Sequence, residues 1–131
     1  MTTYLQTTEA SNIADLYTDW AAAILNYRKI NFYDLTDFTR KNLLDSAMTL
    51  LDNADEQNTA NAAEISEDVR MAFDRTVEVT TEIKKSYSSL ANIEKGIAVA
   101  GCIVALGQTL VTGNLESINN ALNDLLDKWN A

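Results

Sequence analysis

The distribution of glycine and proline favours helices over almost the whole chain. There is no proline, and the four glycines (Gly96, Gly101, Gly107 and Gly113) fall within one short segment. Residues 1–95 therefore lack both of the residues that most strongly interrupt an α-helix. Alanine, leucine and charged residues are plentiful there, and no alternating run of β-branched residues indicates a strand. This pattern predicts an all-α fold.

Apolar residues at helical spacing divide the chain into segments joined by short connections, which is typical of an antiparallel up-and-down bundle of four to five helices. A chain of 131 residues with 47% hydrophobic residues can form one core. We therefore expect a single domain, 1–131, with a frayed N-terminus at 1–10. The expected helices cover about 11–29, 34–57, 62–91, 96–112 and 114–130.

Capping residues support several of these boundaries. Asp34 can cap the second helix, and Asn61 and Glu64 stand in capping-box register before the third. Gly113 followed by Asn114 indicates the end of one helix and the cap of the next. The sequence leaves open whether 62–112 breaks near 91–96 or continues as one long helix.

The last expected helix carries a regular apolar seam. Its members lie 3, 4, 3 and 4 residues apart, a spacing typical of a helix packed lengthwise against another helix. The seam consists of Leu115, Ile118, Leu122, Leu125 and Trp129. We take these five residues as a candidate interface, with a partner protein or with a second copy of the chain.

A long uncharged segment precedes this seam, because the twenty residues from Gly96 to Leu115 carry no charge. A helix that is apolar all round is buried in a protein core or in lipid. About 20 mostly apolar residues can span a bilayer. However, Gln108 and several threonines and glycines weaken that reading, and no basic or aromatic belt flanks the segment. We favour a helix in the middle of a soluble core, with membrane insertion of 96–113 as the alternative.

Net charge and the N-terminus limit the partners and the location. Nineteen acidic against ten basic residues give a net charge of −9. Such a field repels nucleic-acid phosphates and anionic membranes, so no nucleic-acid partner is expected. The first residues lack the basic and apolar regions of a signal peptide, and we therefore expect a cytoplasmic location.

The chemistry that side chains offer is sparse. The chain has no histidine and one cysteine, Cys102. These counts exclude Ser-His-Asp and Cys-His catalysis, structural zinc and an internal disulfide. No glycine-rich phosphate loop or EF-hand is present. Carboxylate pairs such as Asp15/Asp19 and Glu78/Glu82 are typical of ordinary surface acids. We predict no enzyme activity, no catalytic, cofactor-binding or metal-binding residues, no cofactor and no small-molecule ligand.

Aromatic residues gather where the first two helices should meet, next to basic residues. Such a cluster forms either a binding patch or the closure of one end of the bundle, and we favour closure. The cluster comprises Tyr27, Arg28, Lys29, Phe32, Tyr33 and Phe38.

No motif identifies a family. The sequence therefore predicts a non-catalytic helical-bundle protein, of unknown biological role, that acts through protein–protein contact or self-assembly. The alternative is a membrane-active helical protein that uses the segment 96–113.

Overall fold

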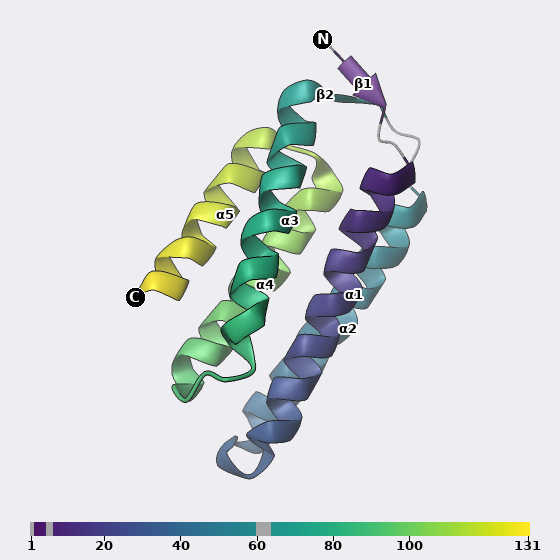
Figure 1. Cartoon of the computed structure of the whole chain (residues 1–131). Helices are drawn as coiled ribbons and strands as arrows, with labels where there is room; N and C mark the ends of the chain where they lie inside the picture. The colour runs from purple at the N-terminus through teal and green to yellow at the C-terminus, as the bar shows by residue number, and fades with distance from the viewer. Residues whose placement is uncertain (1, 5–6, 60–63) are drawn as a thin grey trace.

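Five helices run alternately up and down the molecule and pack around one apolar core (Figure 1). The computed structural model describes residues 2–4, 7–59 and 64–131. Within this part, the predicted antiparallel helical bundle is confirmed, and 62–112 contains two helices rather than one long one. The helices are α1 (Thr7–Ile30), α2 (Asp37–Thr59), α3 (Glu67–Tyr87), α4 (Ile93–Thr112) and α5 (Leu115–Asn130).

The start of α2 differs from the prediction. Asp34 lies in a short 3₁₀ helix, η1 (Phe32–Asp34), so its predicted role as the cap of α2 is wrong. Thr36 caps the helix instead, because its Oγ1 accepts a hydrogen bond from the backbone N–H of Thr39 at 3.1 Å. The helix therefore begins at Asp37, where a carboxylate in the first turn favours the N-terminus.

The start of α3 differs because a short ribbon precedes it. Strand β2 (Glu64–Ser66) pairs antiparallel with strand β1 (Thr2–Tyr4), with Thr3 opposite Ile65. The predicted helix start at 62 is therefore wrong. Glu64 belongs to a strand that ends before α3 begins, so it does not stand in the first turn of the helix, and Asn61 lies outside the described residues.

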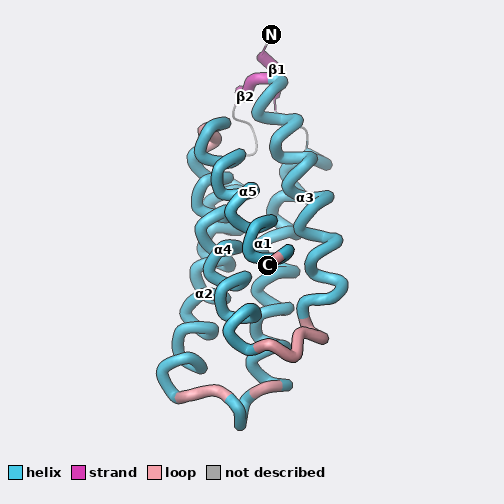
Figure 2. Tube along the Cα trace, turned by 90° about the vertical axis from the view of Figure 1, so that its left-hand side faces the viewer, coloured by secondary structure: helices cyan, strands magenta, loops and turns pink. Residues whose placement is uncertain are grey.

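The ribbon occupies the end of the bundle opposite the α1–α2 connection (Figure 2). The segment 1–10, expected to be frayed, contains β1 and the first turn of α1. Threonine, tyrosine and isoleucine favour extended backbone, which suits both strands.

Between α3 and α4 the chain leaves the helical conformation after Tyr87, and Asn92 caps α4 with a side-chain oxygen that accepts from the Lys95 N–H at 3.1 Å. The helix therefore starts at Ile93, three residues before the expected start at 96. The predicted boundary between α4 and α5 is confirmed. Gly113 has a φ of 67°, and the Asn114 side chain accepts from the Ser117 N–H at 2.9 Å.

Large aromatic side chains from α1 and α3 occupy one region of the core. Tyr87 of α3 lies between Trp20 and Tyr27 of α1, with ring centroids 5.2 and 5.0 Å apart. All three are buried. These three side chains lie against the start of α4, where the Tyr87 hydroxyl donates to the carbonyl of Gly96, and they therefore determine how α4 packs.

Candidate interaction surfaces

Two tyrosine hydroxyls attach α4 to the rest of the bundle. Tyr87 donates a hydrogen bond to the carbonyl of Gly96 at 2.9 Å, and Tyr17 donates one to the carbonyl of Gly107 at 2.7 Å. Both bonds are buried, where an unpaired hydroxyl would be costly. The inner face of α4 therefore makes specific hydrogen bonds, as well as apolar contacts, with the helices that it packs against.

The glycines at these positions permit the close approach. A Cβ at Gly96 would lie 2.2 Å from Tyr27 Oη and 2.3 Å from Tyr27 Cζ. A Cβ at Gly107 would lie 2.9 Å from Tyr17 Cε1. Any larger residue would displace a buried ring, so two of the four glycines serve packing between α4 and α1.

The outer face of α4 is exposed, which corrects one expectation. A helix surrounded on all sides was predicted, but Gly101, Ala105 and Gln108 face solvent while Val99 and Ile103 face the core. Among the described residues, α4 is the one helix long and apolar enough to cross a membrane. Its mean hydropathy is 1.5, and 39% of the apolar window is buried. Length and composition alone do not separate such a helix from the core helix of a soluble protein.

The α5 seam is covered mostly by the chain itself. Ile118, Leu122 and Leu125 are fully buried in the core of their own bundle. Leu115 and Trp129, at the two ends of the seam, are partly buried and pack against that core. Of the five candidate interface residues, only these two reach the surface in the folded chain.

The connection between α1 and α2 displays large apolar side chains to solvent. Tyr33 is 94% exposed, Phe38 is 76% exposed and Ile30 is 61% exposed. We call residues 28–41 the α1–α2 tip. The prediction that the aromatic residues close the end of the bundle agrees with the burial of Tyr27. It is wrong for Tyr33 and Phe38, because both side chains are exposed.

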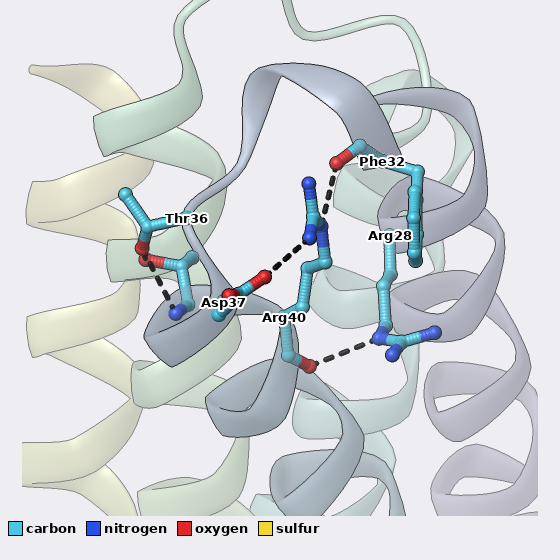
Figure 3. A network of polar contacts seen from close by, with 6 residues as sticks. Arg28, Phe32, Thr36, Asp37 and Arg40 are labelled. Carbon is cyan, nitrogen blue, oxygen red and sulfur yellow. Dashed lines mark hydrogen bonds and ion pairs between the residues drawn. The ribbon is translucent and has the colours of Figure 1, made fainter.

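Two arginines hold the tip in one conformation (Figure 3). The Arg40 Nε donates to the carbonyl of Phe32 at 2.7 Å, and its guanidinium pairs with Asp37 at 2.6 Å. The Arg28 Nε donates to the carbonyl of Arg40 at 2.9 Å. The Arg40 and Arg28 guanidinium carbons lie 4.2 and 5.4 Å from the centroid of the Phe32 ring, within the range of cation–π attraction. The exposed aromatic side chains therefore project from an ordered turn.

The tip also differs from the rest of the chain in charge. It contains four basic and two acidic residues, whereas the remainder contains six basic and seventeen acidic residues. Lys29 and Lys41 are exposed within this segment. The tip is thus a basic, aromatic surface on an otherwise acidic protein.

A groove lies between α3 and α5 on another face of the bundle. Its apolar lining consists of Val79 and Ile83 of α3 with Leu126 and Trp129 of α5, and its volume is about 390 Å³. Two exposed carboxylates, Glu78 and Glu82, line it on the α3 side. We call these six residues the α3–α5 groove. Trp129 was predicted as an interface residue, whereas Val79 and Leu126 were not among the predicted interface residues.

The titratable groups with shifted pKa values have structural explanations. Burial raises the pKa of the Cys102 thiol and of the Tyr27 and Tyr87 hydroxyls. A hydrogen bond from Arg70 lowers the pKa of Glu67. Across the residues described, no three His, Cys, Asp or Glu side chains come together in a group that could hold a metal ion. The tip and the groove are therefore the candidate functional sites of the described residues.

Comparison of the chain with protein-family models, with curated proteins and with solved structures finds no match. Its function therefore has to be inferred from its own surfaces.

Proposed function

We propose that this chain is a non-catalytic helical-bundle protein that acts through contact with another protein, and that the α1–α2 tip is its contact surface. The observation that carries the proposal is the exposure of Tyr33 and Phe38 on a turn held by Arg28 and Arg40. Tyrosine, phenylalanine and arginine are enriched in protein interfaces.

The order of the tip supports this proposal. Single exposed apolar residues are common and need no explanation. Here Ile30 at the end of α1, Tyr33 in the connection and Phe38 in the first turn of α2 are all exposed within nine residues. Arginine side chains bond the backbone carbonyls of Phe32 and Arg40 in the same segment. A surface that is already ordered loses less conformational entropy on binding than a flexible loop does. The tip therefore combines apolar area with the preorganisation that a contact surface needs.

Site-specific photo-cross-linking in the cells that make the protein tests the proposal. A photoreactive phenylalanine analogue replaces Tyr33 in one variant and Met48, which is exposed on α2 away from the tip, in a matched control. We expect a protein adduct of defined mass from position 33, lost when Phe38→Asp is added, and none from position 48. No adduct from position 33, or equal adducts from both positions, would contradict the proposal.

Membrane activity of α4 is the second candidate, because its mean hydropathy reaches 1.5 and it carries no charge from Gly96 to Thr112. Liposome flotation tests it with the wild type and Gly101→Glu. The substitution suits this purpose because a Cβ at Gly101 meets nothing within 4 Å, so the bundle should tolerate it. Flotation of the wild type that the glutamate abolishes would favour the membrane role, and a wild type that never floats would remove it.

A further inference from the structure

We infer that the α1–α2 tip of one copy of the chain docks in the α3–α5 groove of a second copy. The inference rests on the proposed function, because it names the partner that the tip contacts. Both surfaces are exposed in the single chain, and one contact between copies would cover them both.

The two surfaces are complementary in chemistry. The tip presents the rings of Tyr33 and Phe38, and its exposed charged residues are Lys29 and Lys41 with Asp34 and Asp37. The half-buried arginines Arg28 and Arg40 make the segment basic as a whole. The groove offers an apolar floor that includes Trp129, with the carboxylates of Glu78 and Glu82 at its edge. One cation already lies near this floor, because Lys95 Nζ is 5.1 Å from the centroid of the Trp129 ring. Aromatic side chains on an apolar floor, surrounded by opposite charges, match the usual arrangement of a protein interface.

Glu82 already has a neighbouring cation, since Lys85 Nζ lies 3.1 Å from its carboxylate. Both side chains of this pair are more than 60% exposed. Such a pair contributes little to stability and is screened by salt. A docking lysine can therefore share or replace Lys85 at Glu82 without loss to the fold.

The size of the groove suits side chains rather than a larger ligand. A volume of about 390 Å³ lies near the lower end of the roughly 300–1,000 Å³ of small-molecule pockets. It admits one or two aromatic side chains but not a whole helix. The tip offers two exposed rings, Tyr33 in the connection and Phe38 in the first turn of α2.

The position of the tip makes the contact one between copies. The tip extends past the α3–α4 connection at its end of the bundle, clear of the other helices (Figure 1). The groove lies on the flank formed by α3 and α5. A tip-to-groove contact joins two different surfaces, so each copy keeps one free tip and one free groove, and the contact builds rings or open chains.

The net charge of the chain favours a contact between the tip and the groove over contacts between two acidic surfaces. Two copies with −9 each repel one another, so association is favoured only where a basic surface meets an acidic one. The tip is the basic surface of the chain and the groove has an acidic edge.

Sedimentation velocity with two variants and their mixture tests the inference. The tip variant is Tyr33→Ser with Phe38→Asp, and the groove variant is Glu78→Lys with Glu82→Lys. All four side chains are exposed, so the bundle should fold in both variants. Asp52→Lys with Asp55→Lys is the control, because it changes the net charge as the groove variant does but lies on α2.

We expect the wild type and the control to associate at concentrations up to about 1 mM, where even a weak contact is populated. Each contact variant alone should associate at least tenfold more weakly, since truncation of a central interface residue typically has this effect. The equimolar mixture of the two variants should form a one-to-one dimer, through the intact tip of one and the intact groove of the other.

Other outcomes overturn the inference and identify what replaces it. Association by the tip variant alone would indicate a contact that does not use the tip, and association by the groove variant alone would indicate a contact that does not use the groove. A wild type that stays monomeric while position 33 still forms a cross-linked adduct would overturn the inference and leave the proposed function standing. A monomeric wild type without an adduct would remove both.

Discussion

Two glycines on opposite faces of α4 should respond to the same substitution with opposite signs. Gly101 is exposed, and a Cβ there meets nothing within 4 Å. Alanine is more favourable than glycine in a helix interior by about 0.8–1 kcal/mol. We therefore expect Gly101→Ala to raise the free energy of unfolding by about 0.5–1 kcal/mol.

At Gly96 the same methyl group meets the Tyr27 ring, with 2.2 Å to Oη and 2.3 Å to Cζ. The ring is buried and packs against Tyr87, so it cannot swing into solvent. Overpacking of a core typically costs about 1–3 kcal/mol, and this contact is severe enough for the upper part of that range. After the gain in helix propensity, Gly96→Ala should lower the free energy of unfolding by about 1–2 kcal/mol.

Urea denaturation followed by circular dichroism measures both variants beside the wild type. The two should differ by about 1.5–3 kcal/mol, which corresponds to roughly 10 °C in Tm for a chain of this size. The far-ultraviolet spectra should be alike, which shows that helix content is retained. If Gly96→Ala stabilised the protein as much as Gly101→Ala does, the packing of α4 against Tyr27 would be wrong.

Four further predictions concern α4 and the residues that contact or end it. Tyr87→Phe should lower the free energy of unfolding by about 0.5–1.5 kcal/mol, since the buried hydrogen bond to the Gly96 carbonyl is lost. Burial raises the pKa of Tyr87, so as the pH rises the Tyr87 hydroxyl loses its proton in the unfolded chain before it does so in the folded chain. The free energy of unfolding should therefore not depend on this hydroxyl below about pH 10 and should fall above it, less steeply in Tyr87→Phe. An equally steep fall in the variant would contradict this. Gly113→Ala should be destabilising by about 1 kcal/mol in urea denaturation, because φ is 67° and no contact compensates; an unchanged midpoint would contradict a left-handed cap. Cys102, half-buried with a raised pKa, should react with a thiol reagent more slowly in the folded than in the unfolded chain, and equal rates would contradict its burial.

The fold class and most helices were predictable because they depend on local information. The apolar spacing of Ile118, Leu122 and Leu125 shows which face of α5 is buried, and all three are buried. Gly113 and Asn114 fix a boundary through their own backbone and side chain. The β1–β2 ribbon was not predictable in this way, because Thr3 and Ile65 pair across 62 positions of sequence and neither segment has a strand pattern of its own.

The tip was only partly predictable. The aromatic and basic residues were visible in the sequence, but which of them are buried depends on how far the hairpin extends past its neighbours. Phe38 carries a weak signal. The buried face of α2 includes Leu43, Ala47 and Leu50, and three- or four-residue steps back from Leu43 reach 39 or 40 and then 35–37, so position 38 lies off this face. The groove depends on Val79 and Leu126 from helices far apart in sequence, and only packing brings these together.

The central claim, that the α1–α2 tip is a contact surface, is tested most directly by the size of the species that contains this chain in extracts of the cells that make it. Size-exclusion chromatography compares the wild type, Tyr33→Ser with Phe38→Asp, and the control Met48→Asp, which removes a different exposed apolar side chain. We predict that the wild type and the control elute as species larger than the 14.5 kDa chain, and that the tip variant elutes as the single chain. A wild type that elutes as the single chain, or a tip variant that elutes with the wild type, would contradict the claim.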